Sequence, residues 1–296
     1  MKSLIGLLLP ATLALALLAA PVGARAADSP VVIVAAENFY GDVAKQIGGP
    51  EVAVASVLSS PDQDPHLFEA SPSVARNISA ARIAIANGID YDPWMEKLLA
   101  AARSADRKTI VVADLVGKKP GDNPHIWYDP ATMAALAGAL SGALETADPP
   151  HKAAYEERLA RFLQSLRPIR TRIAALRARL AGTPVTATEP VFGCMFDALG
   201  LEVRDRAFQL AVMNNTEPSA SDIAGLEGDL RMHRVRLLAY NRQATDPIAE
   251  RMEKLARASG IPVIGVTETE PAGKDYQAWM GSVLDAVDQA LPARAK

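Results

Sequence analysis

The sequence contains a single cysteine, Cys194, and four histidines among its 296 residues. One thiol cannot form an intramolecular disulfide, and it cannot build a multi-thiolate metal cluster. The fold must therefore be stabilised without covalent cross-links, and any metal must be held by His, Asp or Glu.

The sequence also has no large excess of positive or negative charge. The 31 Lys and Arg residues and the 34 Asp and Glu residues give a formal net charge of −3, without a basic patch of the kind that binds nucleic acid. After the N-terminal apolar run, no second run is long enough to span a bilayer. These features argue against a nucleic-acid-binding protein and against a protein with several membrane spans.

The N-terminus has the features of a secretory signal peptide. Lys2 supplies a positive charge, Leu4–Ala20 is almost wholly apolar, and Ala24-Arg25-Ala26 offers a small-x-small cleavage pattern. The apolar run is short for a membrane anchor, which needs about 20 residues, although retention of an uncleaved leader stays open. No cysteine lies near the cleavage site, which disfavours a lipid anchor. We expect a leader at 1–26, cleaved before Ala27, and a soluble periplasmic remainder.

The remaining chain of roughly 270 residues is long enough for two domains. Short β-branched runs alternate with helix-patterned segments, which is typical of βαβ units. The expected strands are Val31–Ala36, Val52–Leu58, Arg82–Asn87, Thr109–Ala113, Pro184–Thr188, Leu201–Arg204, Val235–Tyr240 and Pro262–Val266. The expected helices include Tyr40–Ile47, Pro72–Ala80, Ser219–Met232 and Pro247–Ala258. We predict an α/β fold of two (βα)4-like lobes, 27–148 and 183–296, each a mostly parallel sheet with helices on both faces.

The segment 149–182 between the lobes has helical periodicity and no strand pattern. From His151 to Leu180, apolar residues recur at helical spacing. About 30 residues at 1.5 Å each would make a rod of roughly 45 Å. Pro168 should kink this helix, because it removes one backbone hydrogen bond and clashes with the carbonyl of Gln164. The segment could be an ordinary amphipathic core helix, or a single link that limits domain closure to a small tilt.

The four histidines lie in two kinds of surroundings. His151 follows two prolines, and His233 lies among Arg231, Arg234 and Arg236, so both are expected at the surface. His66 and His125 lie instead on loops, and each directly follows a proline. A preceding proline restricts the backbone and stiffens such a loop. Ligands of open α/β sheets bind at the carboxyl ends of the strands, where these loops are expected.

The sequences around these two histidines are Asp64-Pro65-His66-Leu67-Phe68-Glu69 and Asn123-Pro124-His125-Ile126-Trp127-Tyr128-Asp129-Pro130. They resemble the two histidine motifs of the zinc/manganese solute-binding proteins of ABC importers, the cluster A-I metal receptors. The likeness continues through Glu189-Pro190-Val191-Phe192-Gly193 and Val266-Thr267-Glu268. It implies a non-enzymatic, monomeric periplasmic receptor that delivers a divalent metal to an inner-membrane permease and its ATPase. The ligands that it implies are His66, His125, Glu189 and Glu268.

The chain departs from the commonest family pattern at three positions. Glu189 replaces a third histidine, Glu268 replaces an aspartate, and Asn241 replaces a glutamate. The first change resembles the manganese-type members. Only Gly117–Asn123 precedes the second motif, so the histidine- and acid-rich loop of many zinc-specific members is missing.

Several neighbouring residues stay open as alternative ligands or as partners behind the ligands. Glu270 and Asp275 lie in the same loop as Glu268 and compete with it for the fourth position. Glu37 and Asn38, just beyond the first strand, could line the same cleft, and Asn241 could support the ligands.

Two imidazoles and two carboxylates give a formally neutral site around a dication, which limits the cost of burying its charge. Imidazole suits zinc and iron, whereas carboxylate oxygens favour higher coordination numbers and so lean towards manganese or ferrous iron. Zinc nevertheless binds most sites with nitrogen and oxygen ligands more tightly than manganese does. The sequence therefore leaves zinc, manganese and ferrous iron as candidates.

Two other functions remain to be weighed. A secreted metalloenzyme would need an open coordination position and a nearby general base, but neither a His-Glu-x-x-His element nor a nucleophile elbow is visible. A receptor for a chelated metal or another small organic ligand is the third possibility. Four protein ligands would leave little room for a substrate, which favours the metal receptor.

Overall fold

The computed structural model describes residues 29–60, 68, 71–243 and 246–292. The expected leader at 1–26 and His66 lie outside the described residues. Within the described part, no helix combines the length and the apolar character needed to cross a membrane.

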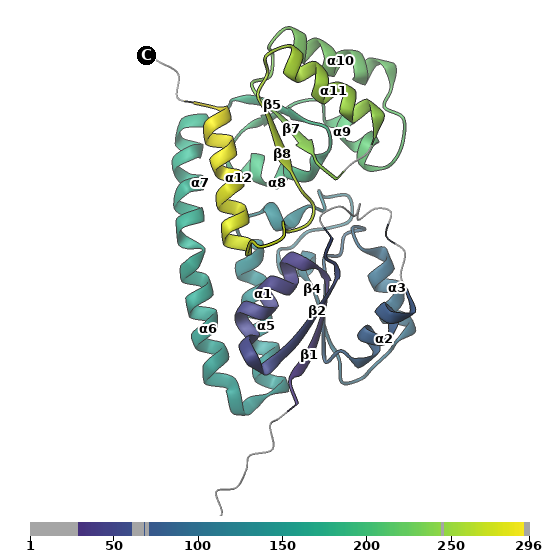
Figure 1. Ribbon diagram of the computed structural model, residues 1–296, viewed down its shortest axis with the longest axis vertical. Coiled ribbons are helices and arrows are strands. Elements are labelled where there is room, and N and C mark those ends of the chain that lie inside the picture. The colour runs from purple at the N-terminus through teal and green to yellow at the C-terminus, as the bar shows by residue number, and fades with distance from the viewer. Residues whose placement is uncertain (1–28, 61–67, 69–70, 244–245, 293–296) are drawn as a thin grey trace, which may run out of the picture.

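The first lobe is a four-stranded sheet with helices on both faces (Figure 1). The strands lie in the order β2-β1-β3-β4, and every neighbouring pair is parallel. In chain order its elements are β1 (Val31–Glu37), α1 (Asn38–Gly48), a 3-10 turn (Gly49–Glu51), β2 (Val52–Leu58), α2 (Pro72–Ala80), β3 (Ile83–Ala86), α3 (Pro93–Ala101), β4 (Lys108–Val111), α4 (Val112–Leu115), a 3-10 turn (Ile126–Tyr128) and α5 (Thr132–Ala147).

The second lobe repeats this plan. Its strands lie in the order β6-β5-β7-β8, again all parallel. Its elements are β5 (Pro184–Ala187), a 3-10 turn (Pro190–Phe192), α8 (Gly193–Ala198), β6 (Glu202–Val203), α9 (Arg206–Met213), α10 (Ala220–Arg231), β7 (Leu238–Asn241), α11 (Pro247–Ala258), β8 (Val263–Val266) and α12 (Tyr276–Ala290). The predicted fold class of two parallel α/β lobes is confirmed.

Alternation along β1 explains why helices cover both faces of the first sheet. Ile33 and Ala35 pack into the core on the side of α1 and α5, while Val34 and Ala36 pack against α2 and α3. Successive side chains of a strand point to opposite faces, so a strand that is buried on both faces must be apolar throughout. This is the continuous β-branched and alanine pattern from which the strand was predicted.

Several predicted boundaries are off by one residue, and three are off by two or more. The strand expected at Thr109–Ala113 ends at Val111, because Val112 and Ala113 begin the short helix α4. The strand expected at Val235–Tyr240 begins only at Leu238. The first helix begins at Asn38, directly after β1, rather than at Tyr40.

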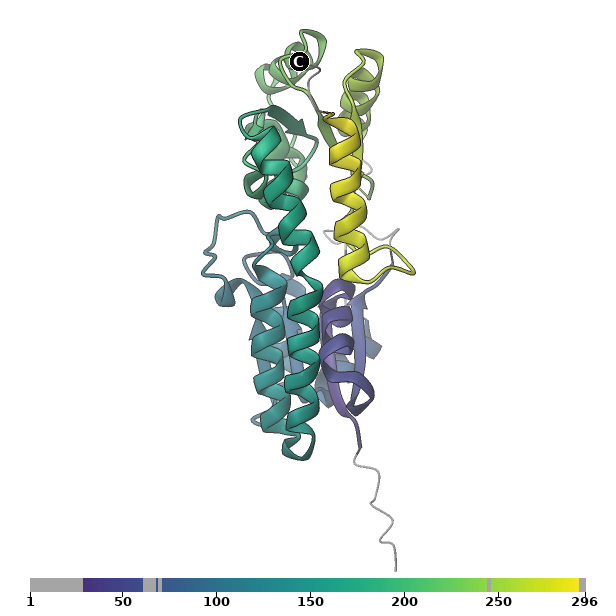
Figure 2. The ribbon, with the colours of Figure 1, turned by 90° about the vertical axis from the view of Figure 1, so that its left-hand side faces the viewer.

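The long link between the lobes is a bent helical rod. α6 (Lys152–Ser165) and α7 (Arg167–Leu180) meet at Leu166, and a 3-10 turn at Pro149–His151 precedes them. Pro168 lies in the first turn of α7, where its missing N–H costs least, so the interruption falls just before it, as predicted. Figure 2 shows the rod running along both lobes.

The two halves of the rod are attached to different lobes. α6 packs on α1 and α5 of the first lobe, and α7 packs on α12 of the second. Arg172 on α7 forms ion pairs with Asp285 and Asp288 on α12. One hydrophobic core continues from the first sheet along the rod to α12. This continuity supports the expectation that the lobes tilt rather than swing apart.

Candidate metal centre

Segments that follow the parallel strands meet between the two lobes. Asn241 ends β7, while Glu189 and Glu268 come two residues after β5 and β8, respectively. His125 of the first lobe faces them from the loop before the Ile126–Tyr128 turn. Asn241, Glu189 and Glu268 thus lie at the carboxyl ends of parallel strands, where ligands of open α/β sheets bind, and His125 approaches them from a loop.

Two of the candidate ligands, His125 and Glu268, approach each other across the lobes. The His125 Nε2 atom lies 3.4 Å from Glu268 Oε2, and the two side chains are 0% and 1% exposed. Two atoms bound to one tetrahedral zinc ion through bonds of about 2.0–2.2 Å lie about 3.4 Å apart. The pair is therefore spaced as two ligands of one small cation would be.

Asn123 fixes the tautomer of His125. Its Oδ1 accepts the backbone N–H of His125 at 3.0 Å, which identifies this atom as the oxygen of the amide. The same Oδ1 lies 2.7 Å from His125 Nδ1, so Nδ1 carries the proton and donates it. In the neutral imidazole the lone pair is then on Nε2, the atom that faces Glu268, as a metal-binding histidine requires.

Asn123 also connects the two lobes. Its Nδ2 donates to the backbone carbonyl of Pro190 at 2.7 Å, one residue beyond Glu189. A Cβ atom added at Gly193 would lie 2.5 Å from Asn123 Nδ2, so this close approach requires glycine. The Asn123 side chain thus fixes the position of His125 in the first lobe relative to Pro190 in the second.

Glu268 is oriented by two donors to its carboxylate and by one acceptor of its backbone N–H. Tyr91 donates its hydroxyl to Oε2 at 3.1 Å, and Asn241 donates an amide N–H to Oε1 at 2.7 Å. The backbone N–H of Glu268 donates to Gln243 Oε1 at 2.5 Å. Burial and then the negative charge of Glu268 raise the pKa of the Tyr91 hydroxyl well above its ordinary value, so it remains a donor.

Glu189 approaches the same point through Asn241. Asn241 Nδ2 lies 3.3 Å from Glu189 Oε2, and the Glu189 side chain is buried. In the described part of the chain, no three His, Cys, Asp or Glu side chains lie close enough to hold a metal by themselves. The described residues thus bring His125 and Glu268 within ligand spacing, with Glu189 linked to them by one amide.

Glu270, the competitor of Glu268, has Asp42 and Asp275 as its acidic neighbours. Its backbone N–H donates to Asn38 Oδ1 at 2.9 Å, and its carbonyl accepts from Asn38 Nδ2 at 2.8 Å. Burial, followed by the charges of Asp42 and Asp275, raises the pKa of its carboxyl to about 8. Asp275 is occupied as the N-cap of α12. Between the two glutamates, the geometry favours Glu268, and Asn38 acts on the backbone of the loop.

Glu37 is fully buried near Tyr91. Neither of its carboxyl oxygens has a hydrogen-bond partner among the described residues. Burial and then the nearby Asp92 raise its pKa well above the ordinary value of a glutamate carboxyl. A neutral carboxyl would contribute no charge to a cation site, which argues against Glu37 as a ligand.

His151 and His233 lie outside this centre. His233 is exposed, as predicted, and His151 is partly exposed with its Nδ1 atom 2.7 Å from Asp148 Oδ2. His66 belongs to the residues that the structure does not describe, so its role as a ligand stays a prediction.

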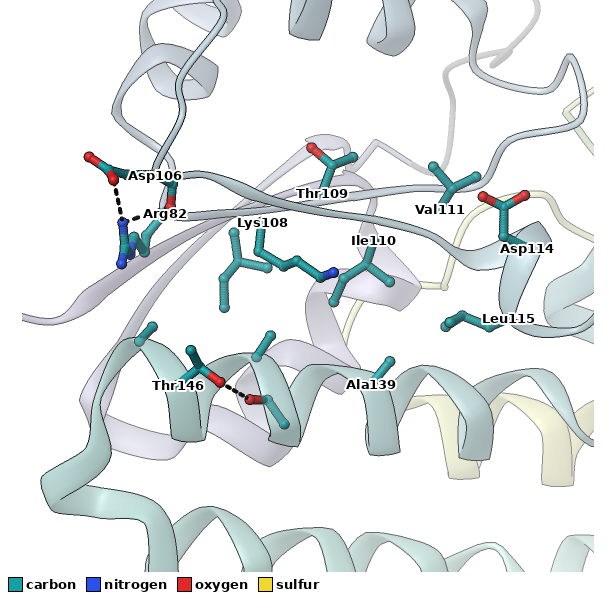
Figure 3. A pocket seen from close by; sticks show the side chains of 14 residues that line it. Arg82, Asp106, Lys108, Thr109, Ile110, Val111, Asp114, Leu115, Ala139 and Thr146 are labelled. Carbon is teal, nitrogen blue, oxygen red and sulfur yellow. Dashed lines mark hydrogen bonds and ion pairs between the residues drawn. The ribbon is translucent and has the colours of Figure 1, made fainter.

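Two cavities help to locate the centre. One of about 450 Å³ lies between the lobes and is bordered by Pro124 and Pro190, the neighbours of His125 and Glu189. The other, of about 620 Å³, lies between β4 and α5 (Figure 3). None of the candidate ligands lines the second cavity, and Lys108 reaches into it, which makes it unsuited to a cation.

Sequence reasoning missed three contributors: Tyr91, Asn123 and Gln243. Tyr91 lies in the loop between β3 and α3, and Gln243 lies two residues after β7. Neither carries a motif of its own, so nothing in the sequence singled them out. Asn123 belongs to the histidine motif, but its action on both lobes depends on the approach of Pro190.

Comparison with known proteins places the chain among metal-binding transport components. The family model described as the periplasmic component A of zinc-uptake complexes matches residues 33–290. The chain is 25% identical over 315 residues to the metal ABC transporter substrate-binding lipoprotein SloC of Streptococcus mutans, covering 98% of this chain and 99% of that protein. It is 24% identical to the manganese-binding lipoprotein MntA of Bacillus subtilis, over 56% of each protein.

Solved structures share the fold. The periplasmic zinc-binding protein TroA from Treponema pallidum superposes with a TM-score of 0.75 at 18% identity, covering 88% of this chain and 99% of that one. A manganese-bound periplasmic metal-binding protein from Candidatus Liberibacter asiaticus gives a TM-score of 0.71, also at 18% identity and with the same coverage.

Replacing Asn123 should weaken metal binding without removing a ligand. Asn123→Leu loses both the acceptor that holds the His125 tautomer and the donor to Pro190, and such outer partners typically contribute about 10–100-fold in metal affinity. Asn123→Asp keeps the acceptor and should retain more of the affinity. Competition with a chromogenic chelator measures both, with exposed Asn214→Ala as the control. Zinc affinity in Asn123→Leu equal to that of the wild type would refute this role.

Glu37→Gln should flatten the pH dependence of stability in the metal-free protein. Above pH 4.5 the unfolded chain loses the Glu37 proton while the folded chain keeps it, because its folded pKa is raised. The free energy of unfolding should therefore fall by up to about 1.4 kcal/mol per pH unit until the folded pKa is reached.

Urea unfolding between pH 5 and 8 measures this slope. The wild type should lose stability relative to Glu37→Gln as pH rises, while exposed Glu217→Gln should follow the wild type. Parallel wild-type and Glu37→Gln curves would mean that Glu37 is ionised in the fold.

Proposed function

The chain belongs to the family of periplasmic component A proteins of zinc-uptake complexes, and from this membership we propose that it captures a divalent transition-metal ion and delivers it to an ABC importer. The observation that carries the proposal is the buried contact between His125 Nε2 and Glu268 Oε2, 3.4 Å apart and contributed by different lobes. An ion at this point would join the two lobes.

We assign the first coordination shell to His66, His125, Glu189 and Glu268. Two neutral imidazoles and two carboxylates balance the charge of a dication, which reduces the cost of burying it. The neighbouring hydrogen bonds are consistent with this assignment, because Asn123 Oδ1 holds His125 Nδ1 and the Nε2 atom faces Glu268. Zinc and manganese are the candidate cargoes, since the matched family is named for zinc and one relative for manganese.

The proposal extends to location and partners. The leader at 1–26, cleaved before Ala27, would release the protein outside the cytoplasmic membrane. The remainder would act as a monomeric, non-enzymatic receptor built from a lobe at 27–148, a link at 149–182 and a lobe at 183–296. A permease and its ATPase in the inner membrane would accept the ion, as the names of the relatives as ABC transporter components suggest.

The ligands can be tested by calorimetric titration of zinc and manganese into the metal-free mature protein. The wild type should bind one ion per chain. His66→Ala, His125→Ala and Glu268→Gln should each lower the metal affinity by at least about 100-fold. Loss of a ligand should cost at least as much as loss of a residue that supports a ligand, which costs up to about 100-fold. His233→Ala, an exposed histidine, is the matched control. Wild-type affinity in the His125→Ala protein would disprove the assigned site.

A further inference from the structure

The side chain of Asn241 contacts both candidate carboxylate ligands, Glu189 and Glu268. We propose that Asn241 determines metal selectivity, because its amide holds Glu189 and Glu268 so that each offers a single oxygen to the ion. This would favour an ion that accepts four ligands, such as zinc, over one that takes more oxygen ligands, such as manganese. The inference rests on the function proposed above.

The direction of the Asn241 amide is set by the backbone of the next turn. The N–H of Gln243 donates to Asn241 Oδ1 at 3.1 Å, so the NH2 group must point to the other side. The backbone N–H of Asn241 donates to Thr188 Oγ1 at 3.2 Å, which ties the residue to the end of β5. Asn241 is 2% exposed, so water competes little for the hydrogen bonds of its amide.

The two hydrogens of this NH2 group match the two carboxylates. Asn241 Nδ2 lies 2.7 Å from Glu268 Oε1 and 3.3 Å from Glu189 Oε2. These two hydrogen bonds hold Glu268 Oε1 and Glu189 Oε2 towards the amide and oppose rotation of either oxygen towards an ion. Glu268 then presents Oε2, the oxygen that lies 3.4 Å from His125 Nε2.

Rotation of the Glu268 carboxylate is opposed from several sides. Tyr91 donates to Oε2, while Gln243 accepts the backbone N–H of Glu268 and, at 3.2 Å, that of Thr269. A carboxylate that is held at both oxygens and at its backbone cannot readily turn both oxygens towards one ion. Bidentate binding, which would raise the coordination number, is therefore disfavoured.

Single-oxygen binding by Glu189 and Glu268 changes the metal preference that would be expected from the number of carboxylates alone. Two glutamates suggest an oxygen-rich site for manganese, since a carboxylate can supply two oxygens and hard ions take six or more ligands. With one oxygen from each glutamate, the two carboxylates and two imidazoles would supply four donors, which is the number that zinc prefers. Selectivity then depends on Asn241 as well as on the ligands themselves.

The test is competition of zinc and manganese for the mature protein carrying Asn241→Ala or Asn241→Ser. Asn241→Ala removes both donors, and Asn241→Ser retains a hydroxyl that can donate to one carboxylate. Thr186→Val, which removes a buried hydrogen bond to Asp205 in the same sheet, is the control for general loosening. Circular dichroism of each metal-free variant confirms that it is folded.

The ratio of the manganese to the zinc dissociation constant should fall by at least about tenfold in Asn241→Ala, by less in Asn241→Ser, and remain unchanged in Thr186→Val. X-ray absorption at the zinc edge should show four ligands in the wild type and more in Asn241→Ala. If Asn241→Ala is unfolded, Asn241→Ser alone carries the test.

Two outcomes separate this inference from the proposed function. A wild-type protein that binds metal, with the ratio and the coordination number the same in the Asn241 variants, overturns the role of Asn241 and leaves the receptor function standing. A similar fall of the ratio in Thr186→Val also overturns it. A wild-type protein that binds neither metal overturns the proposed function itself.

Discussion

The approach of Glu268 to His125 across the two lobes is the contact on which the rest of the centre depends. Both side chains are removed from solvent, so a carboxylate is placed beside an imidazole where water cannot screen or hydrate it. Burying this carboxylate costs free energy unless its polar neighbours are oriented to hydrogen-bond to it and a positive charge can be bound beside it. The surrounding polar residues supply that orientation, and a divalent cation would supply the charge.

Those surroundings form a connected set of amide and hydroxyl groups. Asn123 holds His125 and reaches Pro190, while Asn241 joins Glu189 to Glu268. Gln243 fixes both Asn241 and the backbone of Glu268. These hydrogen bonds are made by neutral groups, so they position the ligands without changing the net charge around the ion. The rod of α6 and α7, packed on both lobes, keeps the two halves of this set in register.

Much of the fold could be predicted because it follows from periodicity. Buried parallel strands must be apolar on both faces, so β1 and β3 are visible as continuous runs, and Pro168 marks the bend of the rod. Strand ends were less certain, as at Val112, because an apolar residue suits a buried helix as well as a buried strand.

The site could be predicted only as far as its motifs reach. His125, Glu189 and Glu268 follow from the resemblance, and the structure brings them towards one point. The choice of Glu268 over Glu270 depends on how the loop is clamped by Gln243 and by Asn38, which are far away in the sequence. Contacts between residues so distant along the chain leave no local pattern, and this also explains why Tyr91 was missed.

The central claim is that one metal ion binds between the lobes with ligands from both. Anomalous scattering from crystals of the zinc-loaded mature protein, collected on both sides of the zinc edge, tests it most directly. We predict one strong peak within bonding distance of His125 Nε2 and Glu268 Oε2, with Glu189 as a further ligand. A peak coordinated by residues of one lobe only, or confined to the surface, would contradict the account.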